Sequence, residues 1–328
     1  MRNFCTLFDS HYIHKGISLY LSLERVAGDF QLYVMAFDRD CYNKLTELAF
    51  PKMIVEYLED FETPELLAVK PTRSRMEYCW TCGPSVIHHF MTKNRLPDIT
   101  YLDADLYFYN DPQIAYDEIG NKSVAITEQY YLTGEFEGKY CVQFMYFKND
   151  TDGIGCLEWW RDRCLEWCYA RYEDGKLGDQ KYLESFPVLF NNVHVIENRA
   201  VPMAPWNMDL YTYENGRMVY EGVSKDIVFF HFHGTKSIIK NNHLILWARY
   251  SITKDQNSLF FTPYAKQLLE VYNTYLGYHL KTYSVRQRSL PLYIVQKVKM
   301  YFRKFSIVRF LYYKVFHLAP KGREKKQI

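Results

Sequence analysis

The sequence predicts an α/β protein with a mixed, mainly parallel sheet flanked by helices. In the first half of the 328-residue chain, short apolar runs alternate with segments whose apolar residues recur at helical spacing. Such alternation is typical of parallel sheets, because each helix returns the chain to the start of the next strand. Apolar residues make up 48% of the chain, which is enough for a sizeable core.

Polar side chains follow several of the expected strands. The carboxyl ends of parallel strands meet at one edge of a sheet, where ligands bind. Asp9, Asp103 and His231 all fall at strand ends and are expected at that edge. We expect strands at 4–8, 31–37, 51–55, 99–102, 123–127, 142–147, 193–196 and 227–232, and helices at 17–26, 38–50, 79–93, 157–169 and 179–186, with a polar stretch at 60–71.

Composition narrows the classes of function. The net charge of +2 argues against a nucleic-acid-binding protein. Cys79 and Cys82 have the two-residue spacing of a zinc motif, but no second pair follows at the required distance, so reduced cytosolic thiols explain the eight cysteines better. The N-terminus leads directly into a strand-like run, without a signal peptide, and no apolar stretch reaches membrane-spanning length. We therefore expect a cytoplasmic protein.

The segment from residue 99 to residue 112, ITYLDADLYFYNDP, carries the strongest chemical signal. An apolar strand leads into Asp103 and Asp105, which are separated by one residue. In an extended chain these side chains point the same way, and two adjacent carboxylates repel each other unless a cation lies between them. Oxygen ligands suit Mg²⁺ or Mn²⁺, which can also bind a diphosphate. The alternative to a metal site is a turn at the end of the strand in which both carboxylates are solvated.

The same segment resembles the Asp-x-Asp motif of glycosyltransferases with the GT-A (Rossmann-like) fold, most closely glycosyltransferase family 8 and its relatives. Similar segments occur in the family's order over most of the chain, from Phe4 to Lys236. They are TLFDSHY at 6–12, CVQFMYFKND at 141–150, GDQ at 178–180, PWN at 205–207 and FHFHGTK at 230–236.

The resemblance implies a metal-dependent transferase that takes a sugar from a nucleotide diphosphate sugar, with UDP-sugars favoured. It implies that the metal is Mn²⁺ or Mg²⁺ and that stereochemistry is retained. Asp179 and Gln180 would flank the reacting sugar as the catalytic pair. The metal ligands would be Asp103, Asp105 and His231, and the residues that bind the nucleotide sugar would be Asp9, Tyr12, Asp103, Gly234 and Lys236.

Three segments depart from the family pattern. The family's helix before the Asp-x-Asp motif often carries an Arg or Lys toward the phosphates, whereas residues 80–84 of this chain, WTCGP, contain no basic residue. The family's strand beside the donor sugar usually begins with Asn and a pair of small residues, whereas this chain has Cys141, Val142 and Gln143. The late motif ends with Lys236 one position away from the family's lysine. We therefore expect contacts with the donor sugar to differ from those of family 8.

The end of the chain differs in charge from the rest. From Arg286 onward there are twelve basic residues and one acid, Glu324. Apolar and basic residues recur there at helical spacing, which favours an amphipathic helix on an anionic membrane surface over a helix packed on the body. We predict a transferase domain at 1–285 and a basic helical tail at 286–328, peripheral on the inner membrane face.

The expected acceptor is a glycan or a lipid-linked sugar of an envelope or capsular polysaccharide. Two alternatives stay open. A nucleotidyltransferase on a similar sheet would need a glycine-rich basic loop near the N-terminus, where this chain offers only Lys15 and Gly16. A non-catalytic, membrane-docked interaction protein would not need the metal ligands at all.

Overall fold

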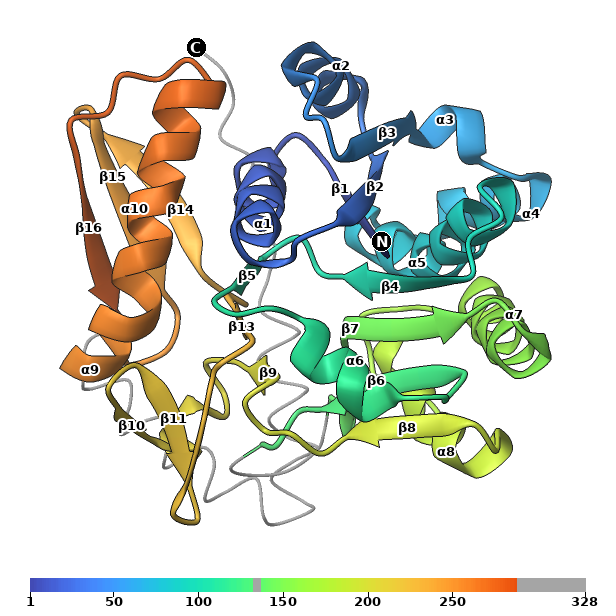
Figure 1. Ribbon diagram of the computed structural model, residues 1–328. Helices are drawn as coiled ribbons and strands as arrows, with labels where there is room; N and C mark the ends of the chain where they lie inside the picture. The colour runs from blue at the N-terminus through green and yellow to red at the C-terminus, as the bar shows by residue number, and fades with distance from the viewer. Residues whose placement is uncertain (132–136, 288–328) are drawn as a thin grey trace.

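A seven-stranded sheet forms the centre of the computed structural model, which describes residues 1–131 and 137–287 (Figure 1). The strand order is β3-β2-β1-β4-β7-β6-β8. The strands are β1 (Arg2–Phe8), β2 (Phe30–Ala36), β3 (Met53–Tyr57), β4 (Asp98–Leu102), β6 (Val124–Glu128), β7 (Tyr140–Lys148) and β8 (Val193–Ile196).

The predicted mixed, mainly parallel sheet is confirmed. The strands β3, β2, β1 and β4 run parallel to one another, and β8 runs parallel to β6. Only β7 is antiparallel to both of its neighbours, β4 and β6. The reversal places the first residues of β7 beside the carboxyl end of β4, because Leu102 pairs with Phe144.

Helices cover both faces of this sheet (Figure 1). On one face, α5 (Arg75–Lys93) and α7 (Thr151–Glu166) bury Phe90 and Trp160 against the strands. On the other face, α1 (Ile13–Val26), α2 (Arg39–Leu48) and α6 (Gln113–Ile119) pack against a second apolar cluster. Neighbouring strand residues contribute to opposite faces, so the inner strands are mostly apolar, as is usual for strands that are covered on both sides.

Helix caps fix where two of these helices begin at the carboxyl edge of the sheet. Asp38 caps α2 by accepting a hydrogen bond from the backbone N–H of Cys41. Ser74 and Glu77 form a reciprocal capping box at the start of α5. The caps place Asp38 and the first residue of α5, Arg75, beside the end of β1.

The second half of the chain forms three small sheets. In one of them β13 (Phe229–His231) lies between β5 (Leu106–Phe108) and β9 (Pro202–Met203). His231 therefore ends a strand of this separate sheet and does not belong to the main sheet. The other two sheets are β10 (Thr212–Glu214), β11 (Arg217–Tyr220) and β12 (Val223–Lys225), and β14 (Lys236–Lys240), β15 (His243–Ala248) and β16 (Thr282–Gln287).

A third apolar cluster joins these small sheets to α10 (Thr262–Glu270), which lies alongside β14, β15 and β16 (Figure 1). The remaining helical segments are short. They are α3 (Leu58–Phe61), α4 (Pro64–Val69), α8 (Phe186–Leu189), α9 (Lys254–Gln256), the 3₁₀ turns η1 (Lys70–Thr72), η2 (Gln180–Ser185) and η3 (Met208–Leu210), and the π-helical η4 (Asn257–Phe261) and η5 (Val271–Tyr275).

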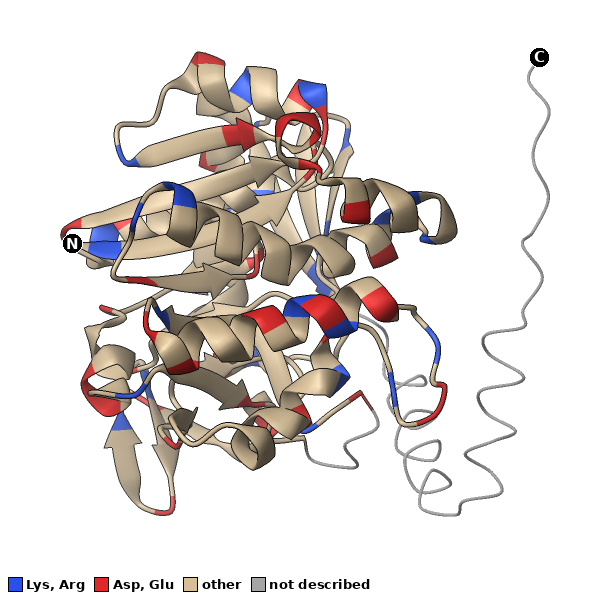
Figure 2. Cartoon of the chain, turned by 90° about the vertical axis from the view of Figure 1, so that its right-hand side faces the viewer, with Lys and Arg blue, Asp and Glu red and all other residues tan. Residues whose placement is uncertain are grey.

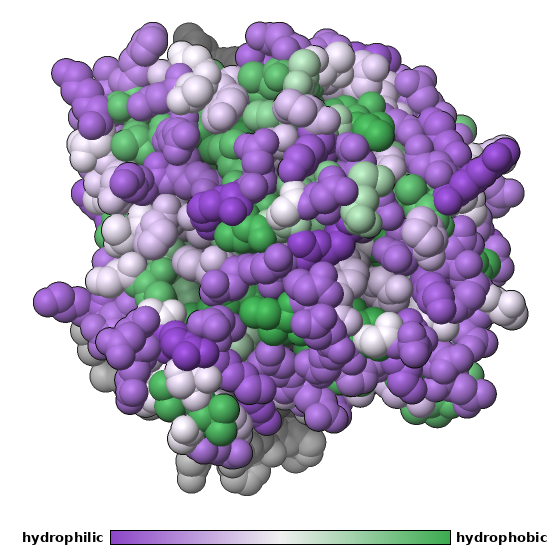
Figure 3. All heavy atoms as spheres, viewed as in Figure 1, coloured by the Kyte–Doolittle hydropathy of each residue, from purple (hydrophilic) through white to green (hydrophobic). Residues whose placement is uncertain are grey.

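Most of the basic tail predicted at 286–328 lies outside the described residues. Arg286 and Gln287 still belong to β16, where they pair with Trp247 and Ala248. Within the described part of the chain, no helix is both long enough and apolar enough to span a membrane. Acidic and basic residues are mixed along the helices seen in Figure 2, and the face in Figure 3 is mostly hydrophilic with small apolar groups.

Candidate functional site

A tight turn presents the two aspartates of the Asp-x-Asp motif. β4 ends at Leu102 and β5 begins at Leu106, whose backbone N–H donates to the carbonyl oxygen of Asp103 at 3.2 Å. The segment is a turn and not an extended chain, so alternation along a strand is the wrong explanation for the shared direction of the two side chains. The turn brings both carboxylates to the carboxyl edge of the main sheet.

His231 reaches this turn through strand pairing. β13 runs antiparallel to β5, and His231 pairs with Leu106. The next residue, Phe232, donates its N–H to the carbonyl oxygen of Asp105 at 2.9 Å. The imidazole Nε2 then lies 3.0 Å from Oδ1 of Asp105 and 3.6 Å from Oδ2 of Asp103. We call Asp103, Asp105 and His231 the Asp–His cluster.

A glutamine on β7 orients the imidazole. Gln143 is fully buried, and its Oε1 accepts a hydrogen bond from Nδ1 of His231 at 2.8 Å. Its amide nitrogen donates to the hydroxyl of Thr127 at 3.3 Å, which fixes the direction of the side chain. With its Nδ1 committed to this bond, His231 presents Nε2 to the two carboxylates. Partners of this kind are typical of metal-binding histidines.

A buried lysine completes the charge arrangement. Lys15 lies on α1 and is 5% exposed, and its Nζ donates to Oδ2 of Asp105 at 3.2 Å. The same ammonium group lies 4.3 Å from the centre of the Tyr12 ring. Asp105 therefore joins two partners, since its Oδ2 pairs with Lys15 and its Oδ1 pairs with His231.

These neighbours set the ionisation of the cluster. Burial opposes the charge on Asp105, but Lys15 and His231 hold its pKa far below its usual value. Burial, opposed by His231 and reinforced by Asp105, raises the pKa of Asp103 to about 6. Burial also works against a charged imidazole, yet Asp105 and Asp103 raise the pKa of His231 above its usual value.

The Asp–His cluster fits a divalent metal ion. One carboxylate oxygen of Asp103 and one of Asp105 each lie within 3.6 Å of Nε2 of His231, and the bond to Gln143 holds the histidine in the tautomer that coordinates through Nε2. Ions such as Mn²⁺ accept this mixture of oxygen and nitrogen ligands. The residues that would hold the ion are Asp103, Asp105 and His231.

A second charged group lies at the ends of β1 and β2. Arg75 donates from Nε to Oδ2 of Asp9 and from an NH₂ group to Oδ2 of Asp38, both at 2.8 Å. Ser10 donates its N–H and its hydroxyl to the same Asp38 oxygen. We call Asp9, Asp38 and Arg75 the surface charge cluster. Tyr12, at the start of α1, is 45% exposed beside it.

Gly234 and Lys236 both follow His231 in sequence, but Gly234 lies in a tight turn and Lys236 lies on an exposed strand. Gly234 has a φ of +69°, and a Cβ there would approach Arg249 to 3.2 Å, so the turn requires glycine. Lys236 is the first residue of β14 and is exposed. No ion pair joins Lys236 to the Asp–His cluster in the described part of the chain.

Asp179 and Gln180 are neighbours in sequence, but their side chains have different surroundings. Asp179 is 8% exposed, and burial together with the charge of Asp103 raises its pKa to about 7. Gln180 turns its amide toward the backbone instead. Its Oε1 accepts from the N–H of Val142 at 3.4 Å, and its Nε2 donates to the carbonyl oxygen of Glu137 at 3.0 Å.

Sequence reasoning missed four residues that the structure brings to these clusters: Lys15, Gln143, Asp38 and Arg75. Lys15 reads as a solvated helix residue, and Arg75 precedes the apolar part of its helix. Gln143 did carry a signal, because it stands where the sequence departs from the family pattern. Asp38 could have been found from its place directly after a strand.

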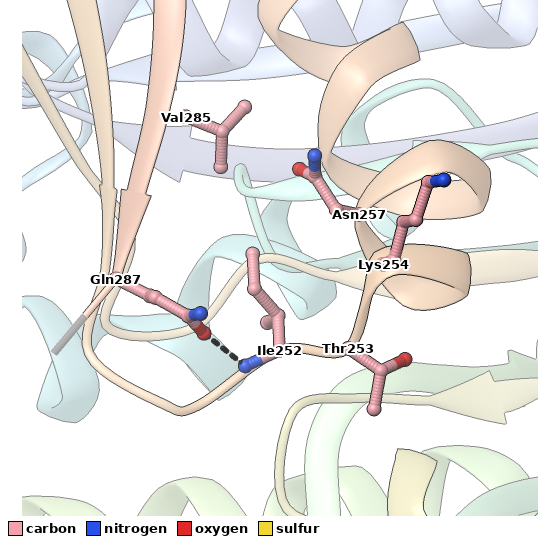
Figure 4. A pocket seen from close by; sticks show the side chains of 6 residues that line it. All are labelled: Ile252, Thr253, Lys254, Asn257, Val285 and Gln287. Atoms are coloured by element: carbon pink, nitrogen blue, oxygen red, sulfur yellow. Dashed lines mark hydrogen bonds between the residues drawn. The ribbon is translucent and has the colours of Figure 1, made fainter. Parts of the chain in front are cut away.

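One further hollow lies away from these groups. It has a volume of about 270 Å³ and opens between the start of α9 and the end of β16. Figure 4 shows Gln287 bonded to the backbone of Ile252 across its mouth.

The fold is shared with solved glycosyltransferases. The galactosyltransferase LgtC, in complex with donor and acceptor sugar analogs, aligns with a TM-score of 0.50 and 10% identity over 81% of this chain and 95% of its own. The apo-form glycosyltransferase GlyE of Streptococcus pneumoniae TIGR4 aligns with a TM-score of 0.50 and 13% identity, over 85% of this chain and 65% of its own. The chain therefore has the GT-A fold.

The sequence also has relatives among curated proteins. The uncharacterized protein YfnF of Bacillus subtilis (strain 168) is 32% identical over 252 residues, which cover 73% of this chain and 83% of YfnF. The uncharacterized protein YfnD of the same strain is 27% identical over 281 residues, covering 81% and 88%. This chain belongs to the same family as YfnF. No protein-family model matches the sequence.

Proposed function

We propose that this protein is a metal-dependent glycosyltransferase that transfers a sugar from a nucleotide diphosphate sugar, UDP-sugars being favoured, to a glycan or lipid-linked acceptor. The observation that carries the proposal is that carboxylate oxygens of Asp103 and Asp105 both lie within 3.6 Å of Nε2 of His231, at the carboxyl edge of a GT-A sheet. Gln143 supports it, because its bond to Nδ1 directs Nε2 of His231 at the two carboxylates, an arrangement typical of metal-binding histidines.

Each group has a distinct task in this proposal. The Asp–His cluster holds the ion, and Lys15 keeps Asp105 charged and in place. A bound divalent ion supplies positive charge that offsets the charge of the diphosphate as it leaves. Gly234 would contact the nucleotide sugar through its backbone, in a turn whose φ of +69° favours glycine. Tyr12 and Asp9 form the side on which the base and ribose bind.

The acceptor hydroxyl attacks the anomeric carbon while the bond to the diphosphate breaks. Asp179 is buried, its pKa is raised by burial and by the charge of Asp103, and in this proposal it would orient hydroxyls of the donor or the acceptor. Gln180 holds the backbone of β7 beside the sugar. Lys236 is exposed and would have to approach the diphosphate after the donor binds. The resemblance to family 8 favours retention of configuration.

The wider setting of the reaction rests on the sequence alone. The acceptor belongs in this proposal to an envelope or capsular polysaccharide. The basic residues from Arg286 onward would hold the enzyme on the inner face of an anionic membrane.

Donor hydrolysis tests the proposed function directly. The purified full chain is incubated with a panel of nucleotide sugars and Mn²⁺, and release of the nucleoside diphosphate is measured. We expect hydrolysis of at least one donor, its loss with a chelator, and a loss of at least about 100-fold in Asp105→Asn, as for removal of a strong electrostatic contact in an active site.

The matched control is Asp117→Asn, which makes the same chemical change at an exposed residue of α6. It should hydrolyse the donor at the wild-type rate. Equal hydrolysis by wild type and Asp105→Asn, or hydrolysis that a chelator leaves unchanged, would reject the metal-dependent mechanism.

A further inference from the structure

Cys141 is the only one of the eight cysteines outside the apolar clusters of the described chain. The other seven either belong to those clusters or pack against them. Cys141 is nevertheless 3% exposed, so it is buried against polar groups. A free thiol usually behaves as a small apolar side chain, and a buried thiol among polar groups therefore needs another explanation.

The polar groups beside Cys141 belong to the Asp–His cluster. The sulfur atom, one carboxylate oxygen of Asp103 and one ring nitrogen of His231 all lie within 4.8 Å of one another. Cys141 precedes Gln143 by two residues on β7, so the two side chains lie on the same face of the strand. That face therefore presents a partner for Nδ1 of His231 and a sulfur atom beside the ligands.

The contacts of Asp105 strengthen the case. One oxygen of Asp105 is already paired with the buried Lys15, and this pairing offsets its negative charge. In the described chain, neither Asp103 nor His231 forms an ion pair with a lysine or an arginine. An ion in this site would thus find oxygen, nitrogen and sulfur donors on three sides.

We propose that Cys141 is a metal ligand, so that the site selects thiophilic divalent ions such as Zn²⁺ or Co²⁺ over Mg²⁺. This proposal rests on the metal site of the proposed function and changes the ion expected there. Thiolate sulfur binds Zn²⁺ and Co²⁺ well, whereas Mg²⁺ requires oxygen ligands. Binding replaces the proton of the thiol by the ion.

Cobalt absorption tests the ligand without reference to activity. The full chain, stripped of metal, is titrated with Co²⁺ and its near-ultraviolet spectrum is recorded. We expect a sulfur-to-cobalt charge-transfer band in the wild type and its loss in Cys141→Ser. The affinity for Co²⁺ should fall by at least about tenfold, the lower end of what disturbing a metal site costs, while the affinity for Mg²⁺ stays unchanged.

The matched control is Cys79→Ser, because Cys79 is a half-buried thiol packed against an apolar cluster. It should keep the band. Thermal unfolding of each variant, with Cys141→Ala as a second substitution, separates loss of the ligand from loss of the fold. Cobalt binding without the band, a band that persists in folded Cys141→Ser, or no cobalt binding would each overturn the proposal.

The outcomes also separate this proposal from the proposed function. Donor hydrolysis with Mn²⁺ that is equal in wild type and Cys141→Ser, together with no charge-transfer band, would leave the glycosyltransferase intact and reject the sulfur ligand. A charge-transfer band in a protein that hydrolyses no nucleotide sugar would support the ligand and reject the enzyme.

Discussion

The Asp–His cluster and the surface charge cluster lie at the same edge of one sheet and use similar residues, yet they differ in burial. The side chains of Lys15, Asp105 and His231 are 6%, 10% and 5% exposed, whereas Arg75 is 58% exposed. The other aspartates are alike in the two clusters, with Asp103 22%, Asp9 19% and Asp38 24% exposed, so the difference lies in the cations and in Asp105. Charges in water are screened and their pairing contributes little, while a buried charge depends on its partner. The comparison predicts that similar substitutions have large effects in one cluster and small effects in the other.

The largest effect is expected from Asp105→Asn. This change leaves Lys15 buried without a counter-charge, and removing one partner of a buried ion pair costs about 3–5 kcal/mol. Unfolding by urea, followed by fluorescence, measures the free energy of unfolding. A second change, Lys15→Met, should restore much of the lost stability but none of the activity. The buried pair is not a stability determinant if Asp105→Asn unfolds at the wild-type urea concentration.

A smaller effect is expected from Gln143→Leu, which removes the acceptor for Nδ1 of His231. The imidazole would then be free to rotate or change tautomer, and metal affinity should fall about 10- to 100-fold. Calorimetry with Mn²⁺ measures the change. Thr127→Val removes only the outer end of this chain of hydrogen bonds and should cost less. Equal affinity in wild type and Gln143→Leu would show that the imidazole is held by other contacts.

In the surface charge cluster, Arg75→Ala should change the free energy of unfolding by less than about 1 kcal/mol. It should still weaken nucleotide binding several-fold, because Arg75 fixes the carboxylate of Asp9. Arg39→Ala is the control, since Arg39 is similarly exposed and its nitrogen lies 3.9 Å from Glu59. Urea unfolding and nucleotide titration of both variants make the comparison. Nucleotide affinity that drops equally in both would indicate a general effect of surface charge.

The smallest expected effect is a pH dependence from Asp38. Burial works against its charge, but hydrogen bonds from Cys41 and Ser10 and the charge of Arg75 lower its pKa. As the pH falls, the unfolded chain binds the proton before the folded protein does. The contribution of Asp38 to the free energy of unfolding is therefore complete above about pH 4, and it is lost as the pH falls through the lowered pKa of Asp38 in the folded protein. Asp38→Asn keeps the helix cap and should lack this slope. Acid unfolding curves that superimpose would contradict the assignment.

The sequence predicted the main sheet well because its strands are buried on both faces and therefore read as apolar runs. It located Asp103 and Asp105 for the same reason, since they end such a run. It did not predict the helices at 58–61 and 64–69, where a Thr63 cap and Pro64 start a helix within a polar stretch. Their stability depends on burial of Leu66, which local sequence does not reveal.

The charge partners within the site were harder to predict. A lysine on a helix is normally solvated, and only the approach of α1 to β5 buries Lys15. Gln143 and Cys141 acquire their meaning from His231, which lies 88 residues from Gln143 in the chain. Such contacts are set by the pairing of strands distant in sequence, and the sequence around each residue does not encode them.

The pairing of β13 with β5 has a consequence for the order in which the molecule is made. Every strand of the seven-stranded sheet lies before residue 197, but His231 is synthesised later and arrives only when β13 adds to β5. A nascent chain can thus complete its main sheet on the ribosome while the proposed set of metal ligands still lacks His231. Capture of the nucleotide sugar would then begin only after the second half of the chain has folded onto the first.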